Sequence, residues 1–195
     1  MMLDSVGDFV AELERAGELV RIRHAVKARL ELCEISDRVM KQPSGGKALL
    51  FENVILDDGR RSAYPVAINL FGSMRRMSMA LGVASLDDIG ARITALMDLK
   101  VPEGIVGKLS LLPRLMAVAK FPPRIRSAAA HCQEIVLQGD QIDLRDIPII
   151  TCWPEDGGPY ITLPMVISKD PKRGIRNVGM YRVQYDSPNT LKMHW

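Results

Sequence analysis

Cysteine is scarce in this sequence and widely spaced. Three cysteines occur among 195 residues, at Cys33, Cys132 and Cys152. An odd and scattered set has neither the pairing of a disulfide framework nor the close spacing of a metal site. The pattern argues against the small disulfide-rich secreted domains and favours the reducing cytoplasm as the location of the protein.

We expect neither a membrane anchor nor a leader, and the sequence has no basic tract. No apolar run approaches the about 18 residues of a membrane-spanning helix. The first ten residues carry Asp4 and Asp8 and have no basic segment followed by an apolar one, so we expect no signal peptide. Runs of Lys and Arg never exceed two residues and the net charge is +3, which excludes nucleic acid as an expected partner.

The composition that is present is that of an ordinary globular chain, with 47% hydrophobic and 25% charged residues. In the first half, capping residues and the spacing of apolar side chains predict helices that alternate with short strands. This order is typical of an α/β or α+β unit with a small sheet. The expected helices are 6–16, 31–42, 74–81 and one after Ser85, and the expected strands are 19–22, 48–51 and 65–70.

Two features of this half invite a functional interpretation. Gly45-Gly46-Lys47 resembles part of a phosphate loop, but it follows a helix and precedes a strand, so we interpret it as a turn. Arg75 and Arg76 lie in the first turn of a predicted helix, where the helix dipole disfavours cations. Solvation is the simplest explanation for both arginines, and an acidic neighbour or a ligand is the alternative.

Residues 101–125 are rich in Pro and Gly, and we expect them to connect a first domain, 1–125, to a second domain, 126–195. In the second domain, short apolar segments between turn residues predict strands, as in a barrel or sandwich. The expected strands are 134–137, 141–144, 147–150, 160–168, 178–184 and 190–195, with a loop at 153–159 and Pro164 marking an edge or a bulge.

The last twenty residues contain the strongest functional signal, because an amide, a glycine and a guanidinium lie in one predicted hairpin. Asn177 offers an oxygen that a hard cation accepts, and Arg182 offers a fork for a phosphate or carboxylate. Gly179 marks a bulge or a close approach of ligand to backbone. Strict alternation would place Asn177 and Arg182 on opposite faces, so a shared site requires a bulge at Gly179. The alternative is an ordinary hairpin with a solvated arginine.

Several motifs along the whole chain resemble those of one enzyme family. The sequence N-V-G-M-Y-R and the following K-M-H-W are preceded by T-C-W-P-E-D-G-G-P-Y-I-T, and matching segments also occur near the start and in the middle of the chain. Together they resemble the UbiD family of reversible, non-oxidative decarboxylases. These enzymes use prenylated FMN, which a partner flavin prenyltransferase supplies.

The resemblance implies an α+β fold, in which an N-terminal α/β domain precedes the first part of a split β-barrel of the FMN-binding type. It also implies that the sequence is truncated. A metal-binding histidine, the acidic residues of the site and a C-terminal domain that makes most of the oligomer contacts would follow Trp195. The longer parent would be a homo-oligomer.

Site residues follow by position from the same resemblance. Asn177 would bind Mn²⁺ that grips the cofactor phosphate, with K⁺ as a possible second cation. Met180, Tyr181, Arg182, His194 and Trp195 would contact the flavin. Arg182 would also orient the substrate carboxylate and act with the missing glutamates as the catalytic arginine.

The implied reaction is decarboxylation of an aromatic or acrylic acid, such as 4-hydroxy-3-polyprenylbenzoate in quinone biosynthesis. A polyprenylated substrate would bring the enzyme to a membrane surface. Without the glutamates, we expect residues 1–195 alone to be inactive. Two other classes stay open: a flavin-binding redox module of the split-barrel type, and a non-catalytic assembly domain.

Overall fold

A computed structural model describes residue 3, residues 5–97 and residues 130–194. Its contacts divide the chain into two units, one of residues 1–82 with 138–195 and the other of residues 83–137. The first unit therefore contains both the predicted α/β region and the predicted strands at the C-terminal end. The predicted connection 101–125 lies outside the described residues, and the domain boundary at 125 stays a prediction.

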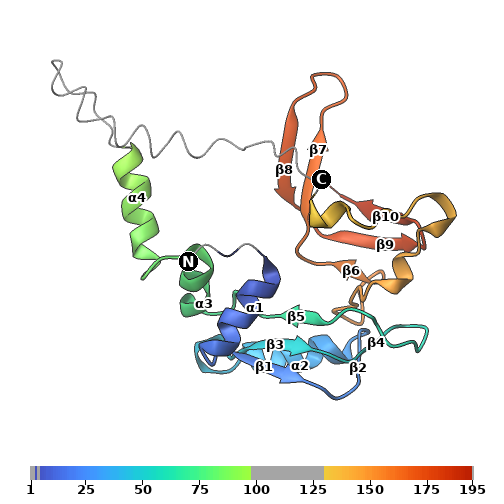
Figure 1. The fold of residues 1–195 in the computed structure, drawn as a ribbon, viewed down its shortest axis with the longest axis horizontal. Coiled ribbons are helices and arrows are strands. Elements are labelled where there is room, and N and C mark those ends of the chain that lie inside the picture. Colours follow the sequence, from blue (N-terminus) through green and yellow to red (C-terminus); the bar gives the residue numbers. More distant parts are fainter. Residues whose placement is uncertain (1–2, 4, 98–129, 195) are drawn as a thin grey trace. The chain divides into compact units, whose positions relative to one another are not determined.

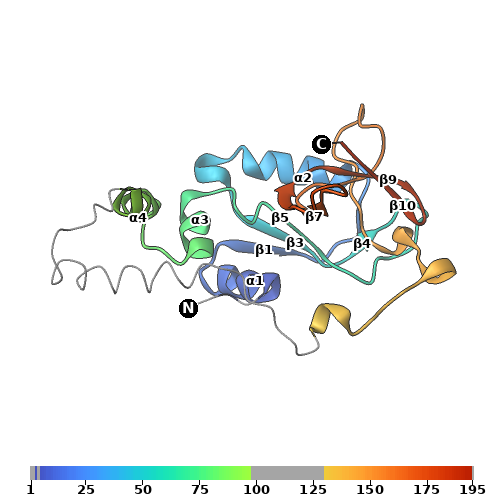
Figure 2. The ribbon, with the colours of Figure 1, turned by 90° about the horizontal axis from the view of Figure 1, so that it is seen from above.

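A three-stranded sheet organises the first part of the larger unit. Its order is β1 (Leu19–Ile22), β3 (Ala48–Phe51) and β5 (Val66–Ile68), with β1 parallel and β5 antiparallel to β3. Helices α1 (Val6–Arg15) and α2 (Glu31–Met40) lie on opposite faces of this sheet (Figure 2). The result is a helix–sheet–helix sandwich, as the alternating elements predict.

Strand β3 is buried on both faces and joins two hydrophobic clusters. Ala48 and Leu50 pack with Phe9 and Leu13 of α1, whereas Leu49 and Phe51 pack with Leu32 of α2. Successive side chains of a strand point to opposite faces, so four consecutive apolar residues serve both helices. This is why β3 is an uninterrupted hydrophobic run.

Helices α1 and α3 (Met74–Leu81) begin at side-chain capping hydrogen bonds, whose serine residues are recognisable in the sequence. Ser5 Oγ accepts the Asp8 N–H at 3.1 Å and begins α1. Ser73 Oγ accepts the Arg76 N–H at 3.1 Å and begins α3, which ends at Gly82 in the left-handed conformation. These caps satisfy N–H groups that a helix start leaves unpaired. The predicted limits of both helices are confirmed to within a residue or two.

The smaller unit contains α4 (Asp87–Met97) and a short 3₁₀ helix, η2 (His131–Gln133). Ser85 and Asp88 form reciprocal contacts at the start of α4, where the Ser85 N–H donates to Asp88 Oδ2 at 3.1 Å. This confirms the predicted cap. None of the helices that the structure describes is both long and apolar enough to cross a bilayer.

The remaining strands form three small sheets (Figure 1). The first pairs β2 (Val26–Lys27) with β4 (Val54–Ile55). The second has the order β10 (Thr190–Met193), β9 (Val183–Ser187) and β6 (Tyr160–Ile161), and the third pairs β7 (Met165–Lys169) with β8 (Arg176–Met180). These sheets form no closed barrel among the described residues. The coarse α+β class is confirmed, and the split barrel is not.

Three of the predicted strands are wrong. Residues 134–137 form no strand, and the short 3₁₀ helices η3 (Gly139–Gln141) and η4 (Leu144–Asp146) take up the ends of the segment expected as strand 141–144. In the segment expected as strand 147–150, only Ile150 pairs, through an isolated bridge to Tyr160. Gln141 Oε1 accepts the Gln138 N–H at 3.4 Å, and Asp143 Oδ1 accepts the Arg145 N–H at 3.0 Å. Such local side-chain hydrogen bonds offer the backbone an alternative to sheet pairing.

Two predicted strands are each split between different sheets. Residues 160–168 break at Pro164, which has no N–H to donate to a ladder, and give β6 and β7. Residues 178–184 break at Tyr181 and Arg182 and give β8 and β9. The terminal hairpin is therefore β9–β10, and Asn177 belongs to a separate sheet. The expected bulge at Gly179 is also wrong, because β7 and β8 pair without a register shift from Met165↔Met180 to Lys169↔Arg176.

The C-terminal part of the larger unit is tied to the α2 side of the sandwich. The Leu30 N–H donates to Thr151 O at 2.9 Å, and the Thr151 N–H donates to Ala28 O at 3.3 Å. Ile150 is buried in the cluster of Leu32 and Phe51. Residues 150–152 therefore enter the core that the first half begins.

Arg76 corrects the expectation of a solvated pair at the start of α3. Its side chain is fully buried, and Nη1 donates to Gly46 O at 2.6 Å and lies 3.2 Å from Glu18 Oε2. Arg75 remains exposed and contacts Glu18 Oε1 at 2.9 Å. The acidic neighbour, which was the alternative interpretation, thus explains both arginines. Gly45 and Gly46 form a turn, as predicted, and their carbonyls face the buried guanidinium.

Candidate functional site

Asn177 and Gly179 of β8 and the following Tyr181 lie close together on one side of the chain. A Cβ added to Gly179 would lie 2.6 Å from Tyr181 Cε2, so the Tyr181 ring lies directly over the glycine. Asn177 Nδ2 donates to the Tyr181 hydroxyl at 3.3 Å. The glycine is required here because its missing side chain leaves space for the ring. It makes a close approach possible, as predicted, but the approaching group is Tyr181.

The other face of the same ribbon is apolar and exposed. Met180 pairs with Met165, and Val178 pairs with Ile167, with all four side chains more than half exposed. Met180, at 67% exposure, therefore lies on the face opposite Asn177. A ligand that contacts both of these predicted site residues has to reach around the ribbon.

Arg182 lies between β8 and β9 and is held by two neighbours. Its Nη1 donates to Asp156 Oδ1 at 2.9 Å, and its Nη2 donates to Asp156 Oδ2 at 2.6 Å. Its Cζ lies 3.8 Å above the centre of the Tyr160 ring. A two-point ion pair and a cation–π contact together fix a guanidinium in position and plane. The alternative of a solvated arginine is therefore wrong, although 40% of the side chain stays exposed.

Asp156 comes from the loop between Trp153 and Pro159. Its Oδ2 also accepts the Trp153 N–H at 3.2 Å, and only 11% of its side chain is exposed. The hydrogen bonds from Arg182 hold the pKa of the Asp156 carboxyl below its usual value, and the carboxylate in turn raises the pKa of Arg182. The pair is thus charged at every pH at which the protein is expected to work.

Two thiols adjoin this pair. Cys33, in the first turn of α2, and Cys152 both pack against the α2 core and line one cavity of about 440 Å³. Burial, followed by the neighbouring Cys152, raises the pKa of the Cys33 thiol to about 12. Cys33 is therefore a poor nucleophile at neutral pH. The cavity wall also includes Trp153 and Leu163, so the cavity is mainly apolar.

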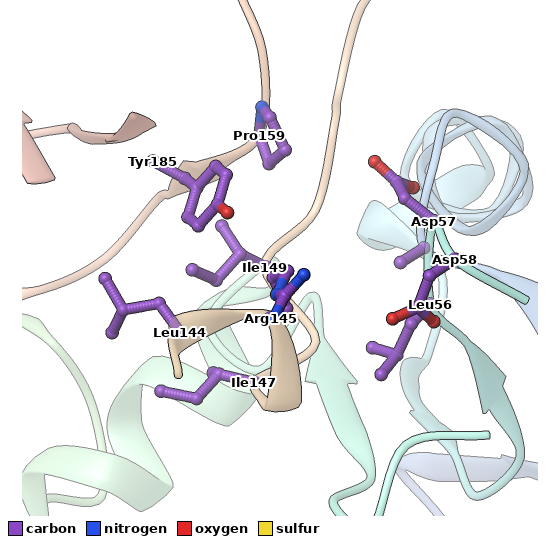
Figure 3. A pocket seen from close by; sticks show the side chains of 10 residues that line it. Leu56, Asp57, Asp58, Leu144, Arg145, Ile147, Ile149, Pro159 and Tyr185 are labelled. Atoms are coloured by element: carbon purple, nitrogen blue, oxygen red, sulfur yellow. The ribbon is translucent and has the colours of Figure 1, made fainter. Parts of the chain in front are cut away.

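A second cavity, of about 180 Å³, lies elsewhere in the larger unit (Figure 3). Leu56, Asp57 and Asp58 form one side of it, and Leu144, Ile149 and Tyr185 are among the residues of the other side. None of the predicted site residues lines this cavity. It holds no charged side chain that is both buried and unpaired, and we assign it no function.

The predicted site residues are only partly brought together. Asn177 and Tyr181 are in contact, but Asn177 and Arg182 share no contact in the described part of the chain. His194 is exposed after β10, and Trp195 lies outside the described residues. In place of the bulge expected to unite the amide and the guanidinium, the chain leaves β8 after Met180 and enters β9 at Val183.

Asp156 and Tyr160 are the neighbours that the sequence analysis did not identify. Both belong to the quoted segment T-C-W-P-E-D-G-G-P-Y-I-T, which was interpreted as a loop and a strand start. The only sequence feature that could have identified Asp156 is an acidic residue among turn-forming residues. That feature is too common to predict which residue Asp156 contacts. Their role depends on contacts with Arg182, which lies 26 positions beyond Asp156 and packs over the Tyr160 ring.

Asn177 has one side-chain atom available as a metal ligand. Its Oδ1 accepts no hydrogen bond from the described residues, so this oxygen is free for a cation such as Mn²⁺. Within the same residues, no group of three or more His, Cys, Asp or Glu side chains is placed to hold a metal. Asn177 therefore fits as one ligand of a larger set and cannot form a metal site by itself.

Comparison with known proteins identifies the family. Residues 10–93 match the 3-octaprenyl-4-hydroxybenzoate carboxy-lyase N-terminal domain, and residues 124–195 match the Rift-related domain of the same enzyme. An uncharacterized protein of Aquifex aeolicus is 46% identical over 188 residues, which are 96% of this chain and 37% of that protein.

Solved structures agree with this assignment. An evolved dimeric form of the UbiD-class enzyme HmfF from Pelotomaculum thermopropionicum, in complex with prFMN, is 27% identical with a TM-score of 0.71. The match covers 99% of this chain and 38% of HmfF. Vanillic acid decarboxylase of Sedimentibacter hydroxybenzoicus, at 22% identity and a TM-score of 0.73 over 99% of this chain and 36% of that one, shares the fold.

The chain thus spans less than two fifths of the length of these relatives. Two adjacent domain matches from one enzyme, together with the fold of the structures, lead to one conclusion: the chain belongs to the UbiD family.

Proposed function

We propose that the protein to which this chain belongs is a decarboxylase that removes CO₂ from an aromatic or α,β-unsaturated carboxylic acid with the help of prenylated FMN. The observation that carries the proposal is the Arg182 guanidinium, which is oriented by Asp156 and Tyr160 and yet 40% exposed. An arginine in this state suits recognition of a planar carboxylate. Prenylated FMN supplies the electron sink for the loss of CO₂ when it is bound.

The residues of this chain would share the work around that cofactor. Asn177 would give its free Oδ1 to a divalent cation, for which we propose Mn²⁺, with K⁺ as a second cation. Met180, Tyr181 and Arg182 would contact the flavin from the end of β8 and the two residues that follow it. His194 and Trp195 would extend this surface after β10. The prFMN complex of HmfF supports a flavin as the ligand.

Several finer points belong to the same proposal. The barrel would be completed by further strands, the boundary near residue 125 would separate the N-terminal and cofactor-binding domains, and the whole protein would be a cytoplasmic homo-oligomer. A flavin prenyltransferase would supply the cofactor. Our proposed substrate is a 4-hydroxy-3-polyprenylbenzoate, because both matching domains are named after 3-octaprenyl-4-hydroxybenzoate carboxy-lyase.

A flavin titration tests the proposal on this chain. We expect FMN fluorescence to be quenched more strongly with Mn²⁺ than without it, and Asn177→Ala to remove the difference. Asn189→Ala, which changes an amide at the β9–β10 turn, is the matched control and should keep it. Flavin binding that is indifferent to Mn²⁺ and to Asn177 would favour a redox module, and no flavin binding would favour an assembly domain. Decarboxylation by residues 1–195 alone would contradict the expected need for further residues.

A further inference from the structure

Two neighbours, Asp156 and Tyr160, fix the orientation of the Arg182 guanidinium. We propose that Asp156 and Tyr160 are positioning residues, which lock the Arg182 guanidinium so that only the edge carrying Nε and Nη2 is open to a carboxylate ligand. This inference rests on the proposed role of Arg182. Neither Asp156 nor Tyr160 has to touch the ligand for it to hold.

The hydrogen-bond donors of the guanidinium define the edge that stays open. A guanidinium has five N–H groups in one plane. Asp156 takes one from Nη1 and one from Nη2, so it occupies the end-on fork. The Nε–H and the second Nη2 proton point along the neighbouring edge and form the other two-point fork of the group. The Cys152 thiol also lies beside the guanidinium, but a thiol is a weak acceptor that a carboxylate displaces.

Tyr160 blocks access to one flat side of the Arg182 guanidinium. The Tyr160 ring covers one flat side of the guanidinium, 3.8 Å from Cζ. The ring is itself held, because Tyr160 pairs with Gln184 of β9 and its N–H donates to Ile150 O at 2.8 Å. A ligand therefore approaches Arg182 in the plane of the guanidinium rather than from the Tyr160 side.

Asp156 has the features of a fixed support. It is held from behind by the Trp153 N–H, and the loop that carries it is fastened where Gln184 Nε2 donates to Gly157 O at 2.7 Å. Its side chain is 11% exposed, against 40% for Arg182. The shielded member of the pair is the support and the accessible member faces solvent. The competing explanation is that Asp156 is a placeholder that the ligand carboxylate displaces.

NMR of the 195-residue chain with ¹⁵N-labelled arginine distinguishes these explanations. Because the two-point pair blocks rotation about Cζ–Nε, we expect separate Nη1 and Nη2 signals for Arg182. These should merge in Asp156→Asn and remain separate in Asp156→Glu. Tyr160→Phe should keep them and Tyr160→Leu should broaden them. Asp186→Asn is the matched control, since Asp186 pairs with Lys192. Merged signals in the unsubstituted chain would overturn the inference.

Titration with benzoate, a simple aromatic carboxylate, tests the open edge. We expect benzoate to shift the Arg182 Nε–H while the two Nη signals stay separate. Merging of the Nη signals on addition of benzoate would show that Asp156 is displaced, and would overturn the inference. Separate Nη signals with no shift at Nε–H would instead overturn the carboxylate role of Arg182, and with it the open edge, and would leave Asp156 and Tyr160 as its structural supports. The failure of the proposed function is thereby distinguished from the failure of the positioning.

Discussion

Arg75 and Arg76 are neighbours in sequence that share the partner Glu18, yet burial separates their roles. Arg76 is fully buried with a further carbonyl partner, whereas Arg75 is 64% exposed. An exposed ion pair contributes little because water screens it. A buried pair that loses one member leaves a desolvated charge without a partner. Two adjacent arginines are therefore expected to contribute differently to the free energy of unfolding.

The two alanine variants should differ accordingly. We expect Arg76→Ala to lower the free energy of unfolding by about 3–5 kcal/mol, because Glu18 and the Gly46 carbonyl lose a buried donor. Arg75→Ala should cost about 0–1 kcal/mol. Urea unfolding followed by circular dichroism measures both. Equal costs would show that the burial of Arg76 is unimportant for stability.

Among the secondary structure elements, β8 shows how a glycine decides the course of a strand. The Tyr181 ring lies over Gly179, where an added Cβ would come within 2.6 Å of it, and the chain then leaves the β7–β8 ladder. Sequence periodicity suggested an uninterrupted strand from 178 to 184. The interruption depends on a ring that packs back onto its own strand, which alternation alone does not predict.

A substitution at this glycine should therefore act through the tyrosine. We expect Gly179→Ala to lower the free energy of unfolding by about 1–3 kcal/mol, as overpacking does. In the Tyr181→Ala background the same change should cost much less, because the ring is gone. A double-mutant cycle in urea reports the coupling between the two positions. Additive effects would mean that the ring and the glycine do not meet in solution.

In the molecule as a whole, residues from both halves of the sequence build one core. Ile150 from the C-terminal half lies in the α2 cluster of the N-terminal half. Residues 1–82 and 138–195 accordingly form one compact unit. The boundary near 125 is drawn from composition and stays a prediction.

Shared burial predicts shared unfolding. We expect Ile150→Ala to cost about 2–5 kcal/mol and to speed amide hydrogen exchange in β3 and α2 as well as in β9. Ile147→Ala, at a side chain that is 45% exposed, is the control and should change little. Mass spectrometry of exchanged peptides gives the comparison. Faster exchange confined to residues 138–194 would show that the two halves unfold separately.

Much of this protein could be read from short stretches of its sequence. The limits of α1, β1, β3 and α3 follow from caps and from the spacing of apolar residues, which depend on neighbours within a few positions. The family motifs, which are also short stretches of sequence, predicted Arg182 and Asn177 as site residues. The tertiary structure decided which charges meet: Arg76 finds Glu18 across 58 positions, and Arg182 finds Asp156 across 26. These ion pairs form when packing brings distant segments of the chain together and removes water from between them. A local sequence pattern contains no information about such distant partners.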